Sequence, residues 1–195
     1  LPPAAQATGS IAIHLHMFYE DLADEFAGYL RNMPFDYDLY VSVASDDGGR
    51  VCRKAFEGLP GQQRLNIEKV PNHGRDIAPM FCTFGDRLKH YDYVAHLHSK
   101  KSLYNKGATE GWRQYLCGTL LGSEVRIRRI IGLMQAEDQP YGIVYPQNYH
   151  LLPYAANTWL ANKAMGSAWC ARIGIFPVPQ GYFDFPAGSM FWARG

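Results

Sequence analysis

Short segments of alternating apolar and polar residues occur along this chain, separated by longer segments with helical spacing. Residues 11–17 alternate most regularly, so a strand here would carry His14 and His16 on one face and aliphatic side chains on the other. The patterns predict further strands at residues 38–44, 65–70, 91–102 and 141–146. They predict helices at residues 21–32, 51–57, 77–89, 110–121, 123–137 and 158–173.

Strands that alternate with helices in this way predict an α/β fold, a sandwich with a mostly parallel central sheet flanked by helices. Ligands of such sheets bind at the carboxyl ends of the strands. The predicted strands would therefore bring four segments to one edge, residues 16–19, 45–47, 72–76 and 98–102. We expect a linker at residues 1–10 and a single domain at 11–195, excised from a longer chain.

Composition limits the possible functions. The 195 residues, with a mass of 22.0 kDa, suffice for one domain with a substantial core. A net charge of +1 argues against a nucleic-acid binder with a basic surface, and there is no run of about 20 apolar residues that would span a membrane. The four scattered cysteines, without CxxC spacing, are expected to be reduced core thiols in the cytoplasm: Cys52, Cys82, Cys117 and Cys170.

The end of the predicted strand at residues 91–102 is rich in cations. His96 and His98 share one face of that strand, and Ser99, Lys100 and Lys101 follow. Such a cluster indicates a site for an anion or for a metal. For an anion, Arg75 would add a bidentate donor, and the amides of residues 72–76 would lie at the start of a helix.

A metal site would use two histidine pairs, His14 with His16 and His96 with His98, because imidazole is a good ligand for zinc. The lysines beside the second pair oppose a divalent cation, and the chain contains no HExxH motif. The balance of these features favours the anion.

Three carboxylates are candidates for a general base: Asp76, Glu110 and Asp184. Asp184 is the most distinctive, because it lies in an aromatic segment that would raise its pKa and hold it in a cleft. The nearby aromatic residues would either stack on a sugar ring or belong to the core: Tyr182, Phe183, Phe191 and Trp192.

Four segments resemble signature sequences of the rhamnan synthesis protein F family of bacterial polysaccharide assembly. They are IAIHLHMFYEDL from Ile11, NHGRDIAPM from Asn72, YDYVAHLHSKKS from Tyr91 and FPAGSMFWAR from Phe185. The resemblance extends from Ile11 to Arg194. It implies a glycosyltransferase that builds rhamnose-containing or related cell-surface glycans, including O-antigen of lipopolysaccharide.

A more distant resemblance connects the chain with glycosyltransferases of the GT-A fold. Residues 72–75 stand where those enzymes carry an N-x-G loop with a nearby arginine, and residues 97–101 stand where they carry an acidic L-D-S-D-D motif that binds a metal. This chain has no acid in that segment. The resemblance thus implies a metal-independent site, without a cofactor, in which protein cations stabilise the departing diphosphate.

The resemblance also implies roles for individual residues. His98 and Lys100 would stabilise the leaving group, and Asp184 would deprotonate the acceptor in an inverting displacement. Arg75 and Asp76 would position the donor. The other expected substrate-binding residues lie along the predicted strands or at their ends: His14, His16, Tyr19, Ser45, Asn72, Gly74, His96, Ser99, Lys101 and Trp192.

These inferences predict a dTDP-, UDP- or GDP-linked sugar donor and a glycan or lipid-linked glycan acceptor. A cytoplasmic location is expected, with peripheral association at the inner face of the plasma membrane through domains outside this chain. Two alternatives stay open. One is a zinc-dependent hydrolase that uses the two histidine pairs, and the other is a glycan-binding module without turnover.

Overall fold

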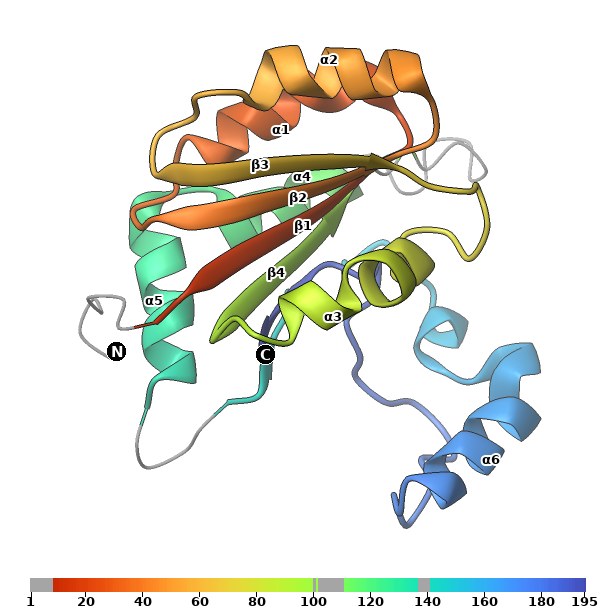
Figure 1. The fold of residues 1–195 in the computed structure, drawn as a ribbon. Helices are drawn as coiled ribbons and strands as arrows, with labels where there is room; N and C mark the ends of the chain where they lie inside the picture. Colours follow the sequence, from red (N-terminus) through yellow and green to blue (C-terminus); the bar gives the residue numbers. More distant parts are fainter. Residues whose placement is uncertain (1–8, 100, 102–110, 137–140) are drawn as a thin grey trace.

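The computed structural model describes residues 9–99, 101, 111–136 and 141–195. Its centre is a six-stranded sheet with helices on both faces (Figure 1). Across the sheet the strands are β3 (Gln62–Lys69), β2 (Tyr37–Val43), β1 (Ile11–Met17), β4 (Tyr93–His98), β6 (Phe191–Arg194) and β5 (Ile143–Val144). The first four strands in this order are parallel, and β6 is antiparallel to both of its neighbours. The predicted mixed α/β architecture with a mostly parallel sheet is confirmed.

One face of the sheet holds the larger core. Four helices cover it: α1 (Ala23–Leu30), α2 (Asp46–Phe56), α4 (Trp112–Leu121) and α5 (Glu124–Met134). The opposite face is covered by η2 (Pro79–Thr83) and α3 (Gly85–Leu88), where Met80, Phe84 and Leu88 form a smaller core. The remaining short helices are η1 (Glu20–Leu22), η4 (Tyr154–Asn157), η5 (Leu160–Asn162) and α6 (Lys163–Arg172).

The alternation in β1 determines which side chains enter which core. Ile13 and Leu15 lie in the larger core, whereas His14 and His16 face the side of η2 and α3. All seven residues of β1 are buried because both faces of the sheet are covered. The histidines are therefore polar groups inside the protein and need hydrogen-bond partners there.

The helix predicted at residues 51–57 begins earlier, at Asp46 of α2. Ser45 is the N-cap, and its Oγ accepts a hydrogen bond from the Gly48 amide. Asp46 and Asp47 occupy the first turn, where the positive end of the helix dipole favours acids. The N-cap and the acids of the first turn therefore stabilise a helix here, although Gly48 and Gly49 have low helix propensity.

The helix predicted at residues 77–89 is divided. It consists of the π-helical turn η2 and the short helix α3, and the Phe84 amide donates to the Pro79 carbonyl five residues earlier. Residues 71–75, which precede η2, are exposed. Residues 71–75 lie at the carboxyl end of the parallel strands, between β3 and η2. Asp76, which follows them, is hydrogen-bonded to the buried His96.

The predicted helix at residues 158–173 is shorter and comprises η5 and α6. Three of the four cysteines are buried, as predicted, but Cys82 is exposed, and all four are free thiols. Cys82 was wrongly assigned to the core because η2 turns its side chain away from the sheet. Within the described ranges no helix has both the length and the hydropathy needed to cross a membrane.

Candidate functional site

The two histidine pairs lie side by side in the middle of the sheet. β1 and β4 are parallel neighbours, and their register places His14 opposite His96 and His16 opposite His98. β2 lies on the other side of β1, with Ser42 opposite His16. The two strands with HxH spacing are therefore neighbours in the sheet.

The buried side chains form a continuous chain of hydrogen bonds, which we call the histidine chain: His16, Ser42, His14, His96 and Asp76. His16 Nδ1 lies 2.8 Å from Ser42 Oγ, which lies 3.1 Å from His14 Nε2. His14 Nδ1 lies 2.9 Å from His96 Nδ1, and His96 Nε2 lies 3.3 Å from Asp76 Oδ2. The parallel strands thus carry one polar path from β2 to the loop before η2.

Proton positions along the histidine chain follow from its acidic end. An ionised Asp76 only accepts, so His96 donates from Nε2 and accepts at Nδ1. His14 then donates from Nδ1 and accepts at Nε2 from the Ser42 hydroxyl, which in turn accepts from His16 Nδ1. When all three imidazoles are neutral, each hydrogen bond of the histidine chain has one donor and one acceptor. His16 Nε2 then carries no proton and remains an acceptor.

Burial favours the neutral forms of His14 and His16. It lowers the pKa of His14 well below 6.5, and the neighbouring His96 lowers it further. Burial also lowers the pKa of His16, although the negative charge of Asp76 acts in the opposite direction. For Asp76 itself burial works to raise the pKa, but the hydrogen bond from His96 and the charge of His98 hold it well below its usual range.

His98 connects β4 to the segment before β6. Its Nε2 donates to the carbonyl of Gly188 at 2.7 Å and lies 3.9 Å from Asp76 Oδ2. Gly188 adopts a φ of +89°, and an added Cβ would lie 2.8 Å from Leu116 Cδ1. Glycine is therefore required where the chain passes close to His98.

Ser99 and Tyr19 join the ends of β4 and β1. The Tyr19 amide donates to Ser99 Oγ at 2.8 Å, and the Ser99 amide donates to the His16 carbonyl at 2.9 Å. Lys101 forms an ion pair with Asp21, and its Nζ lies 4.9 Å from the centre of the Tyr19 ring. The hydrogen bond from Lys101 lowers the pKa of Asp21.

The 72–76 loop presents a cation at the same edge. Gly74 has a φ of +74° and Arg75 a φ of +54°, so the chain turns sharply before η2. Asn72, Gly74 and Arg75 are exposed, and Arg75 pairs with no acid among the described residues. Lys100 and Glu110 lie outside the residues that the structure describes.

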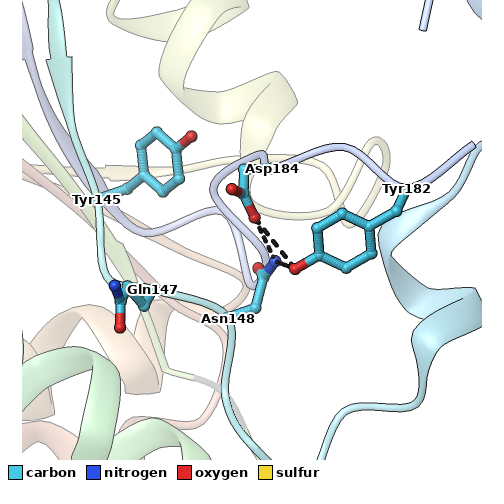
Figure 2. A pocket seen from close by; sticks show the side chains of 5 residues that line it. All are labelled: Tyr145, Gln147, Asn148, Tyr182 and Asp184. Carbon is cyan, nitrogen blue, oxygen red and sulfur yellow. Dashed lines mark hydrogen bonds between the residues drawn. The ribbon is translucent and has the colours of Figure 1, made fainter.

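Asp184 lies in a polar pocket with a volume of about 400 Å³, lined also by Tyr145, Gln147, Asn148 and Tyr182 (Figure 2). The Asn148 amide donates to Asp184 Oδ1 at 3.0 Å, and the Tyr182 hydroxyl donates to the same oxygen at 3.2 Å. The other carboxylate oxygen points away from both donors (Figure 2). The side chain is exposed rather than enclosed by its aromatic neighbours.

The pocket and the histidines lie at the same edge of the sheet. β5 is antiparallel to β6, which is antiparallel to β4, so β5 and β4 run in the same direction. Residues 145–148 follow the carboxyl end of β5, and residues 184–190 lead into β6 from that edge. The structure therefore brings together His98, Asp76, the 72–76 loop and the Asp184 pocket at the carboxyl edge.

Two of the expected site residues have structural roles. Trp192 is fully buried in the larger core, where its Nε1 donates to the Leu120 carbonyl, so its ring has no face exposed for stacking on a sugar. The Ser45 hydroxyl caps α2. The sequence patterns at Trp192 and Ser45 are as typical of a core residue and a helix cap as of a ligand site.

The imidazoles bind one another instead of converging on a common point. Within the described part of the chain, no group of three His, Cys, Asp or Glu side chains could hold a metal ion. His14 and His96 are occupied by Ser42, by Asp76 and by each other. Residues 97–101, which were compared above with the GT-A metal motif, contain no acid that could bind a metal.

Sequence reasoning missed several residues of this edge. Ser42 is an interior position of β2, and only its register opposite His16 reveals its role. Tyr145, Gln147 and Asn148 follow a strand of two residues, which gives little periodic signal. Their position at or just after the end of the strand predicted at residues 141–146 is the one feature that could have identified them.

The comparison with protein families gives one match. The family model described as rhamnan synthesis protein F matches residues 3–195 of this chain. A search of curated proteins found no match.

Proposed function

Because the chain belongs to the rhamnan synthesis protein F family, we propose that it is a glycosyltransferase of polysaccharide biosynthesis. In this proposal it transfers a sugar, such as rhamnose, from a nucleoside-diphosphate donor to a growing cell-surface glycan. The observation that carries the proposal is the Asp184 pocket, a polar cavity with an accessible carboxylate at the carboxyl edge of the sheet. The mixed sheet, with that edge open to ligands, is consistent with a GT-A-like arrangement.

The pocket offers groups that suit a sugar. Asn148 and Tyr182 hold Asp184 Oδ1, which leaves the second oxygen to accept a proton from an acceptor hydroxyl. The Oδ1 atom of Asn148 is buried and has no partner among the described residues, so it is an unsatisfied acceptor in a residue of the pocket wall. Tyr145 adds an aromatic ring to the wall.

The proposed step is a single inverting displacement. The acceptor oxygen attacks the anomeric carbon as Asp184 takes its proton, and the bond from that carbon to the diphosphate oxygen breaks. The diphosphate leaves with the electron pair. Arg75, His98, Lys100 and Lys101 would stabilise its charge in place of a metal.

Asp184→Asn tests the base. The variant keeps an acceptor for Asn148 and Tyr182, and we expect kcat to fall by about 100-fold or more with little change in donor affinity. Asp24→Asn on α1 is the control and should keep the normal rate. A near-normal rate for Asp184→Asn would show that another group is the base.

Donor turnover with dTDP-, UDP- and GDP-sugars, with and without a chelator, tests the reaction class. Full activity in chelator supports the cationic site, and Arg75→Ala should then weaken donor binding while Arg64→Ala, on β3, should not. Loss of activity in chelator would support the zinc hydrolase or another metal enzyme. Sugar binding without turnover would support a binding module.

A further inference from the structure

Residues 151–182 form an arm that extends away from the sheet, with η4, η5 and α6 as its helices (Figure 1). Among the described helices and strands, α6 packs chiefly on η5. The arm is therefore stabilised mainly by its own side chains, and most of the surface of α6 is exposed.

The inner side of the arm is organised around Trp159. Its ring contacts α6 at Gly166, where an added Cβ would lie 2.3 Å from the indole. Its Nε1 donates to the Pro179 carbonyl at 2.7 Å, and its ring centre lies 4.7 Å from that of Phe183. The inner side of the arm thus supports the segment that carries Asp184.

The exposed surface of the arm carries large apolar side chains. On α6 and at its C-cap, Met165, Trp169 and Ile173 have exposed fractions of 67%, 54% and 64%. Leu160 and Phe176, on either side of α6, are 63% and 70% exposed. Single exposed apolar residues are common, but five large ones on one small arm indicate an interaction surface.

The charge of the arm has one sign. Residues 141–183 contain no Asp or Glu, whereas Lys163 and Arg172 stand at the two ends of α6 and are exposed. The Arg172 guanidinium lies 5.1 Å from the centre of the Trp169 ring. A positively charged apolar surface complements a negatively charged apolar one.

We propose that this exposed apolar surface of the arm binds the surface of an anionic lipid bilayer. The exposed Trp, Ile and Met side chains would enter the acyl boundary, and Lys163 and Arg172 would meet the headgroups. The arm supplies only positive charges, which a negatively charged leaflet attracts. The lipid surface is the occupant that fits both observations.

This binding goes beyond the proposed transfer reaction and does not rest on it. Because Trp159 links α6 to Phe183, a docked arm would hold the Asp184 pocket close to the headgroups, where a lipid-linked acceptor would be presented. Vesicle binding by an inactive protein would therefore separate this inference from the proposed function.

Co-sedimentation with vesicles tests the proposal. The chain should bind vesicles of phosphatidylglycerol and phosphatidylcholine more tightly than vesicles of phosphatidylcholine alone. Trp169→Glu should weaken binding by about tenfold or more, because it places a charge in the apolar surface. Lys163→Gln and Arg172→Gln should each weaken binding to the anionic vesicles by about fivefold, the factor expected for one cation near the surface.

Val125→Glu is the matched control, because Val125 is a 56% exposed apolar residue on α5, outside the arm. It should bind the anionic vesicles like the unmodified chain. Equal binding to both kinds of vesicle, or equal binding by Trp169→Glu, would overturn the proposal. A dimer that Trp169→Glu dissociates, without vesicle binding, would assign this surface to a second copy of the chain instead.

Discussion

At the scale of single residues, Ser42 is a small uncharged side chain on which two buried histidines depend for hydrogen bonds. Its hydroxyl donates to His14 Nε2 and accepts from His16 Nδ1, so one small side chain satisfies two buried imidazoles. Without it, both nitrogen atoms would be buried without partners. A buried polar atom that loses its partner costs more than the bond itself contributed, because its hydration is not restored.

Ser42→Ala should therefore destabilise the fold strongly. We expect a loss of about 3 kcal/mol in the free energy of unfolding, at about 1–3 kcal/mol for each unpaired group. Ser45→Ala, which removes only the α2 cap, should cost about 1 kcal/mol. Urea denaturation of both variants measures the difference, and equal losses would show that the serine bridge contributes no more than a cap.

Sequence reasoning identified the four histidines of the sheet but not how they are used. The HxH spacing showed that each pair shares a strand face, and this suggested a metal or an anion as the partner of all four. The register of β1 with β2 and β4 is a long-range property, and it gave the imidazoles protein partners instead. The arrangement of donors and acceptors could not be predicted from the sequence of any single strand, because it depends on the register of three strands.

At the scale of elements, α6 depends on a glycine. The Trp159 ring packs directly on Gly166, and this contact sets the distance between α6 and the segment at Pro179. The helix has few other contacts with the described elements. A side chain at position 166 would separate the two parts of the arm.

Gly166→Ala should disturb the arm but not the sheet. The added Cβ would lie 2.3 Å from Trp159, and relief of that overlap should cost about 1–3 kcal/mol locally. Gly28→Ala in α1, where nothing lies within 4 Å of the added Cβ, should stabilise the protein by about 0.5–1 kcal/mol. Trp fluorescence and limited proteolysis of residues 151–182 would report the change, and an unaltered arm in Gly166→Ala would contradict it.

Elements with a regular spacing of apolar residues were predictable. Elements whose bounds depend on capping or on long-range packing were not. β1, β2 and β4 were located from their alternation, and α5 from its helical spacing. The helix predicted at residues 51–57 begins five residues earlier in the structure, at Asp46, because Ser45 caps it. The division into η2 and α3 follows from the π-helical turn, and no periodicity in the sequence signals it.

At the scale of the whole molecule, the sheet combines a buried polar path with an open polar pocket. The histidine chain lies between the strands and η2, where burial lowers the pKa of His14 and His16. The Asp184 pocket lies at the carboxyl edge, between β5 and the segment before β6. His98 links the two, since its Nε2 donates to the Gly188 carbonyl and lies 3.9 Å from Asp76 Oδ2.

The histidine chain makes the stability of the whole protein sensitive to acid. His14 and His16 have pKa values below 6.5 in the folded state, mainly because of burial, whereas in the unfolded chain they return to about 6.5. His96 faces both and lowers their pKa values, and Asp76 raises them by less than burial lowers them. As the pH falls below about 6.5, the unfolded chain binds protons that the folded protein cannot, so stability decreases.

The free energy of unfolding should therefore be constant above pH about 7.5 and fall by as much as about 1.4 kcal/mol per pH unit for each of these two histidines below about 6.5. Asp76 has a lowered pKa and acts with the same sign at lower pH, since its ionised form is the one that the fold stabilises. Urea denaturation at pH about 7.5 and about 5.5 measures the loss. His14→Gln should reduce the loss, whereas His73→Gln, in the exposed loop before η2, should leave it unchanged. Equal stability of the unmodified chain at both pH values would mean that the imidazoles bind protons as readily in the fold as in the unfolded chain. The order of protons from His16 to Asp76 would then be wrong at pH about 5.5.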